Sequence, residues 1–164
     1  MKTTSIILLT ALCSASAAFT FSSDAISAEL KKASNEKQAA TAITFRKSLL
    51  QLVRSNMGPL GAMAKGNIPM DADVIALNAS RIEFLGDMIH EYFALDTTAF
   101  SIETDAKDDL WKNYDDFTNK ANDLVKAAAN LQELVANKQE SDYRKGIGAL
   151  GGACKACHDD YKKD

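Results

Sequence analysis

The sequence predicts an all-α fold, an antiparallel up-down-up-down four-helix bundle. Apolar residues recur at helical spacing in four separate stretches, with almost no strand signal between them. Only two prolines occur in 164 residues, so the chain can support long helices. Turn-forming segments at 66–69, 96–105 and 137–140 separate the stretches. Because the last turn is short, the two helices that it joins should be antiparallel neighbours.

The first two stretches are expected to form the first pair of helices. The apolar side of the first carries Ala42, Phe45, Leu49, Leu52 and Val53. This helix should fray around Gly58 and Pro59, because proline lacks the N–H that a helix interior needs. Asp71 is a good N-cap for the second helix. The inner side of that helix is expected to carry Val74, Leu77, Ile82, Leu85, Ile89 and Tyr92.

The last two stretches have the most regular patterns. In the third, apolar residues alternate steps of four and three, as in a coiled-coil seam, through Leu110, Tyr114, Phe117, Ala121, Leu124, Ala128, Leu131 and Val135. The fourth is expected to start at Ser141 and to carry one stripe, made of Tyr143, Ile147, Leu150, Cys154, Cys157 and Tyr161. Glycines at 146, 148, 151 and 152 should slim this helix, so that a large ring or a neighbouring backbone can approach closely.

The segment Cys154-Lys155-Ala156-Cys157-His158 is the most informative motif of the chain. Cys-x-x-Cys-His is the attachment sequence of a c-type haem. The two thiols form thioethers with the haem vinyl groups, and the imidazole coordinates the iron. On a helix the three side chains project from one face. Since the cysteines lie in the apolar stripe, we expect one covalently attached haem c inside the bundle, near the C-terminal helix.

Two other uses of the motif are less favoured. A redox-active dithiol of the thioredoxin type belongs in a βαβ pattern, and the surrounding sequence lacks one. A zinc site needs four ligands. His90 is the only other histidine, and vicinal ligands at Cys157 and His158 would crowd a tetrahedron. A redox dithiol and a metal-binding or structural cysteine pair remain the alternatives.

The N-terminus is typical of an exported protein. Lys2 precedes a short apolar run over 6–12, and small residues follow, so residues 1–28 are expected to be a signal peptide. Cleavage after Ala17 is the alternative. The run is far shorter than the ~20 apolar residues of a membrane span, so we expect no membrane anchor. Cys13 would leave with the signal. A periplasmic location follows from this interpretation.

Charge and length limit the remaining possibilities. The net charge of −3 and the lack of a basic patch argue against a nucleic-acid partner. Residues 29–164 are the right length for one haem-binding domain.

Several segments, taken in order, resemble cytochrome c′, the class II c-type cytochromes with a C-terminal haem site. They are Ala42–Lys47, the turn Met63–Asp71, Thr98–Phe100, Trp111 and the C-terminal Gly152–Asp159. The resemblance covers nearly all of the chain after the signal. It implies a periplasmic four-helix bundle with covalent haem c. Members usually begin shortly before the arginine segment, which favours cleavage after Ala28.

The resemblance also implies roles for individual residues around the haem. Arg46 matches an arginine near a haem propionate, and a guanidinium suits a carboxylate. Lys47 stands where a glutamine is common and is a second candidate haem contact. Lys162 matches a basic residue one turn beyond the axial histidine. Low-spin relatives carry methionine at the position of Leu50, which has no donor atom. We therefore expect five-coordinate, high-spin iron with Leu50 packed over its open face.

Two methionines are the nearest alternative iron ligands. Met57 and Met63 lie two turns or more from Leu50, and we expect both to fill the core.

The first functional hypothesis is a one-electron carrier that exchanges electrons with small redox proteins or membrane electron-transfer complexes. The second is trapping of nitric oxide or CO, because an apolar leucine offers no hydrogen bond to a bound gas. The third, from the enzyme class, is a thiol–disulfide oxidoreductase using Cys154 and Cys157. The sequence has no signature of a general base or nucleophile pair, so we expect no enzyme that turns over an organic substrate.

The resemblance further implies a homodimer through the first two helices, with Ile43 and Ile75 as expected contacts.

Overall fold

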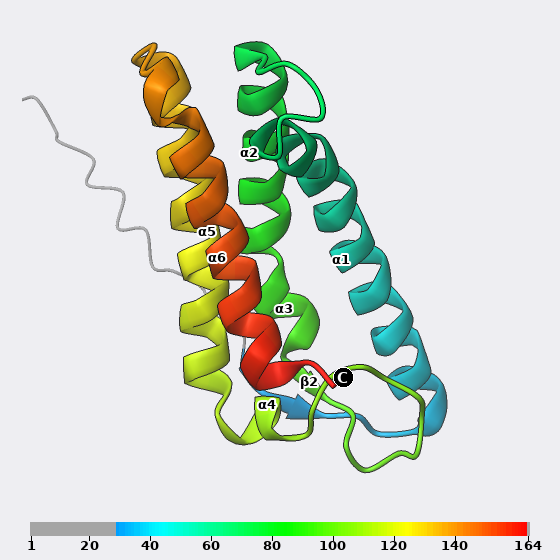
Figure 1. Ribbon diagram of the computed structural model, residues 1–164. Coiled ribbons are helices and arrows are strands. Elements are labelled where there is room, and N and C mark those ends of the chain that lie inside the picture. Colours follow the sequence, from blue (N-terminus) through cyan, green and yellow to red (C-terminus); the bar gives the residue numbers. More distant parts are fainter. Residues whose placement is uncertain (1–28, 164) are drawn as a thin grey trace, which may run out of the picture.

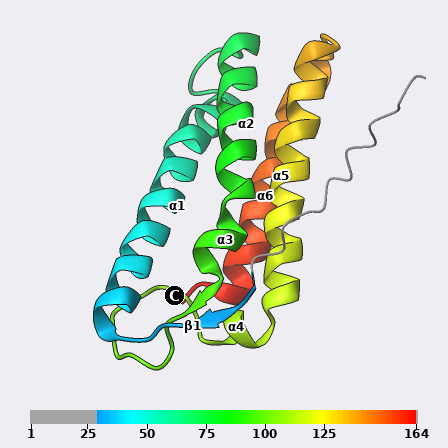
Figure 2. The same cartoon turned by 180° about the vertical axis from the view of Figure 1, so that it is seen from behind.

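The computed structural model describes residues 29–163, and the expected signal peptide, 1–28, lies outside this range. Four long helices form the bundle (Figures 1 and 2), which confirms the all-α prediction. They are α1 (Glu36–Ala64), α2 (Ala72–Asp87), α5 (Tyr114–Ala136) and α6 (Tyr143–Tyr161). The shorter elements are β1 (Lys31–Lys32), α3 (Ile89–Phe93), β2 (Leu95–Asp96), α4 (Asp109–Lys112) and the 3₁₀ turn η1 (Glu140–Asp142).

Helix α1 is longer than the sequence suggested. Asn35 caps its N-terminus, since the side-chain oxygen accepts a hydrogen bond from the Gln38 N–H at 2.9 Å. The expected fraying around Gly58 and Pro59 is wrong, because the helix continues to Ala64 with Pro59 inside it. A proline in a helix interior costs about 3 kcal/mol. Beyond it, Leu60 and Met63 are almost fully buried, and each buried side chain of this size contributes about 1.5–3 kcal/mol.

The buried faces of α1 and α2 differ from the predicted faces. Phe45, Leu52 and Leu77 were expected inside but are 54%, 53% and 51% exposed. Ile43 and Ile75 were expected on the surface but lie in the core. Apolar residues occur around much of both helices, so their spacing fits two neighbouring faces. The face that is buried carries polar Arg46, Asn56 and Asn78 among its apolar residues.

The apolar faces predicted for the other two long helices are largely confirmed, but the third stretch is divided at Asn113 into α4 and α5, and α6 begins at Tyr143 rather than at Ser141. The buried residues of α5 follow the expected seam, at Phe117, Ala121, Leu124, Ala128 and Leu131. In α6 the stripe Tyr143, Ile147, Leu150 and Tyr161 is buried. A Cβ at Gly146 would lie 2.8 and 2.9 Å from the terminal methyls of Leu134 and Leu131. This glycine therefore allows α5, rather than a ring, to pack closely against α6.

One end of the bundle gathers segments that are distant in sequence. The start of α1, the β1–β2 pair, α4 and the C-terminus all lie there (Figures 1 and 2). Strands β1 and β2 are parallel, and flanking hydrogen bonds run from Lys31 N to Ala94 O and from Ala33 N to Asp96 O, both 2.8 Å. None of the helices in residues 29–163 is long and apolar enough to cross a bilayer.

Candidate haem-attachment site

The three motif residues occupy the last turns of α6, at the end of the bundle described above. Cys154 and Cys157 are half-buried and pack against the hydrophobic core, while His158 is exposed. Both cysteines are free thiols. Burial raises the pKa of Cys154, and it raises the pKa of Cys157 to about 11 although Lys120 opposes the shift. Free thiols here would be largely protonated at neutral pH, unlike the low-pKa thiolates of redox-active dithiols.

Helix α1 faces this part of α6 with an apolar surface. A Cβ at Gly151 would lie 3.7 Å from the terminal methyl of Met57, so the Met57 face of α1 is directed toward α6. Leu50 lies two turns earlier on the same face and is 37% exposed. Toward the C-terminus, the ribbons of α1 and α6 stand further apart (Figures 1 and 2). Met57 is half-buried and Met63 is buried, as expected for core residues.

These residues fit a covalently attached haem in their chemistry. Two free thiols and an imidazole stand on one helix face, as the sequence predicted. The incompletely covered apolar residue Leu50 is on the helix that diverges from them. The thiols would supply the thioether bonds, His158 would supply an iron ligand, and Leu50 would supply only apolar contact.

Arg46 has a structural role that the sequence did not predict. The side chain is only 3% exposed, and its guanidinium carbon lies 5.0 Å from the ring centres of both Phe93 and Trp111. It donates three hydrogen bonds, to Tyr92 O at 2.9 Å, to Thr97 Oγ1 at 3.2 Å and to Leu95 O.

This environment constrains Arg46 electrostatically. Burial lowers its pKa to about 10, although Tyr114 and Asp96 act in the opposite direction. A guanidinium has five N–H groups, so two are left over for a further acceptor such as a propionate. Contact between Arg46 and a propionate therefore stays a prediction.

Lys47 and Lys162 lie at the same end of the molecule as the motif. Lys47 is exposed, and its Nζ is 3.5 Å from the carbonyl oxygen of Glu103 in the loop before α4. The backbone N–H of Lys162 donates to His158 O at 3.1 Å, and residue 162 forms an antiparallel bridge with Ala106. The haem roles of both lysines stay predictions.

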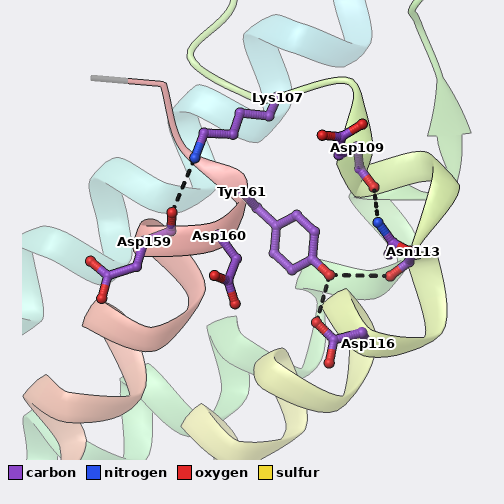
Figure 3. A pocket seen from close by; sticks show the side chains of 7 residues that line it. All are labelled: Lys107, Asp109, Asn113, Asp116, Asp159, Asp160 and Tyr161. Carbon is purple, nitrogen blue, oxygen red and sulfur yellow. Dashed lines mark hydrogen bonds between the residues drawn. The ribbon is translucent and has the colours of Figure 1, made fainter.

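Sequence reasoning missed a polar cluster beside the motif (Figure 3). An open pocket of about 460 Å³ is lined by Lys107, Asp109, Asn113, Asp116, Asp159, Asp160 and Tyr161. The Tyr161 hydroxyl donates to Asp116 Oδ2 at 2.5 Å, and burial together with Asp116 raises the pKa of Tyr161. Lys120 Nζ lies 2.9 Å from Asp160 Oδ2. The apolar stripe did place Tyr161 inside, but no local pattern links it to a carboxylate 45 residues away.

The fold and the site define a class, the c-type cytochromes built as a helical bundle with a C-terminal attachment motif. The family model described as Cytochrome C' matches residues 41–162. Cytochrome c' of Halomonas halodenitrificans is 35% identical over 127 residues, covering 75% of this chain and 96% of that protein. This chain belongs to the cytochrome c′ family, whose members carry covalently attached haem c, and its cofactor is haem c.

Solved structures support the same assignment. Cytochrome c prime from Shewanella frigidimarina has a TM-score of 0.70 and 32% identity, over 79% of this chain and all of that one. A leucine-to-alanine variant of cytochrome c prime from Alcaligenes xylosoxidans, solved as its nitric oxide complex, has a TM-score of 0.66 and 25% identity. That match covers 77% of this chain and 96% of the other.

Proposed function

We propose that this protein is a periplasmic one-electron carrier whose haem iron is five-coordinate and high-spin. Cys154 and Cys157 form the two thioethers and His158 is the single axial protein ligand. The observation that carries the proposal is the motif on one face of α6 together with Leu50, a residue without a donor atom, on the facing side of α1. Burial and ligation then set the reduction potential of the iron.

Covalent attachment is tested by acid–acetone extraction, which removes non-covalent haem only. The wild-type protein should retain its haem, the C154A and C157A single variants should each lose one thioether, and the double variant should release all of it. Ala153→Ser, a change beside the motif, is the matched control and should retain haem. Complete release of haem from the wild type would contradict the proposal and would revive the dithiol hypothesis.

Electron transfer is tested by a potentiometric titration. We expect one reversible step with one electron per protein. A step that fits two electrons would point to a dithiol–disulfide couple instead. The proposed partners are small redox proteins or membrane electron-transfer complexes.

A second proposed function is the binding of nitric oxide or CO at the side of the iron opposite His158. It is favoured by the apolar character of Leu50 and by nitric oxide complexes among the structurally similar cytochromes c prime. Titration of the ferrous protein with nitric oxide tests this function. Submicromolar affinity is expected, and micromolar or weaker affinity would count against a trapping role.

We also propose that Arg46 and Lys47 lie near the haem propionates. Arg46 has unused N–H groups beside the three bonds described above, and Lys47 is one residue further along α1.

The proposed periplasmic location rests on the expected signal peptide, with cleavage after Ala28. N-terminal sequencing of the mature protein tests that position.

The expected homodimer is proposed with a different contact surface. Ile43 and Ile75 are buried and cannot form it. Between α1 and α2 lies a groove of about 910 Å³ lined by Leu52, Ser55, Asn56, Pro59, Asn78, Ser80, Arg81, Phe84 and Leu85. Phe84 is 70% exposed and Leu52 is 53% exposed. A two-fold contact uses the same patch on both copies, so each copy would cover these side chains of the other.

A further inference from the structure

The C-terminal end of α6 is tied by its backbone to the loop before α4. The Lys107 N–H donates to Tyr161 O at 2.9 Å, and the Lys163 N–H donates to Asp105 O at 2.7 Å. Between these two bonds, Ala106 and Lys162 form an antiparallel bridge. Residues 161–163 are therefore held to residues 105–107 by a short antiparallel bridge.

Side chains from two other segments hold the same turn (Figure 3). Lys107 Nζ donates to the carbonyl oxygen of Asp159 at 3.0 Å. Asp159 is the residue that follows His158 in the sequence. From α5, Asp116 accepts the hydroxyl of Tyr161 at 2.5 Å. Tyr161 is only 7% exposed, whereas the side chain of Asp116 is 58% exposed, so the bond joins a buried tyrosine to a carboxylate at the surface. All of these contacts act on residues 159–163.

The location of these contacts matters because of how His158 is held. A metal-bound histidine usually donates its second ring N–H to a protein group, which fixes the orientation of the ring. Within residues 29–163, the His158 ring is exposed and makes no such bond. Among the described residues, the contacts that hold this histidine in the structure are therefore those of the backbone that carries it.

We propose that Lys107, Tyr161 and Asp116 are positioning residues for the axial histidine. They fix the last turn of α6, so that His158 approaches the iron with one defined geometry and bond strength. This inference rests on the proposed ligation by His158. It assigns to the loop before α4 and to the start of α5 a role in setting the properties of the iron–imidazole bond.

The test compares Lys107→Met with Lys112→Met in the haem-loaded protein. Both variants remove one lysine from the same region and change the charge equally. Lys112 instead pairs with Asp109 on its own short helix, at 2.7 Å. Two readouts are used: the iron–imidazole stretching band in resonance Raman spectra of the ferrous protein, and hydrogen exchange at the amides of residues 162 and 163.

In Lys107→Met the stretching band should broaden and move to lower frequency. Exchange at the two amides should accelerate about tenfold or more, as expected for the loss of a hydrogen bond that restrains local opening. Lys107→Arg should restore both readouts, and Lys112→Met should change neither. Tyr161→Phe, which removes only the hydroxyl, should act in the same direction as Lys107→Met.

Two results would overturn the inference, and they differ from failure of the proposed ligation. If exchange accelerates while the stretching band stays unchanged, these residues only stabilise the end of the helix. If neither readout changes, they do not hold the turn at all. A wild-type ferrous protein without any iron–imidazole band would instead show that the proposed ligation itself is wrong.

Discussion

Leu50 is the residue on which the proposed ligation state depends. It lies on the Met57 face of α1, toward α6. The resemblance described above implies a methionine at this position in low-spin relatives. A leucine can fill space over the iron but cannot donate electrons to it. The proposed open coordination position therefore depends on one side chain.

Leu50→Met should place a thioether within reach of the iron. The expected result is conversion of the ferric protein to a six-coordinate, low-spin form with a weak sulfur–iron band at the red edge of the visible spectrum. Absorption spectroscopy measures this directly. Leu52→Met is the control, because Leu52 is 53% exposed and lines the groove toward α2 instead. An unchanged high-spin spectrum in Leu50→Met would remove Leu50 from the distal position.

Arg46 should contribute strongly to stability, whatever its contact with haem. Arg46→Met removes three hydrogen bonds and leaves their buried or half-buried acceptors without this donor. We expect a loss of about 3–5 kcal/mol in the free energy of unfolding. Arg54→Met, at an exposed position of the same helix, should change it by less than about 0.5 kcal/mol. Chemical denaturation of both variants checks the difference, and equal stabilities would show that the Arg46 contacts contribute little.

At the scale of the elements, the helices differ in how closely they approach one another. Helix α6 meets α5 closely at Gly146, but diverges from α1 toward the motif. The same helix therefore packs tightly against α5 near its start, and the attachment motif lies toward its other end, with Lys120 of α5 near Cys157.

Two glycine substitutions in α6 test how closely this helix is packed at each position. In Gly146→Ala the new methyl would lie 2.8–2.9 Å from two leucine methyls, and overpacking of this kind costs about 1–3 kcal/mol. Gly148→Ala meets no atom within 4 Å, so it should gain about 0.5–1 kcal/mol from helix propensity alone. Thermal unfolding of the two variants should move in opposite directions. Stabilisation by both would mean that the side chains of Leu131 and Leu134 can move aside without cost.

Local spacing predicted some features of the molecule well and others not at all. The seam of α5 depends on residues three or four apart, and it was predicted correctly from Phe117 to Leu131. The buried face of α1 was not, because its apolar residues surround much of the helix. Arg46 and its acceptor Tyr92 are 46 residues apart, and no periodicity relates them. The same holds for the pair Tyr161 and Asp116. Such contacts become visible only when the helices are placed in space.

At the scale of the whole molecule, exposed apolar residues on α1 and α2 are the strongest indication of self-association. Phe84→Glu should give a monomer at concentrations where the wild type is a dimer, because a charge in the centre of a two-fold contact is repeated on both copies. Leu30→Glu, a similar change at an exposed residue outside the groove, should leave the dimer intact. Sedimentation velocity measures both. A wild-type protein that is monomeric at micromolar concentration would contradict the proposal.

The central claim is that one face of the iron is held by the protein and the other is open. The absorption spectrum of the purified protein, recorded in the ferric, ferrous and CO-treated ferrous states, tests it most directly. We predict high-spin spectra in the first two states and a large spectral change on addition of CO. Low-spin ferric and ferrous spectra that CO leaves unchanged would contradict the claim, because they require a second protein ligand on the iron.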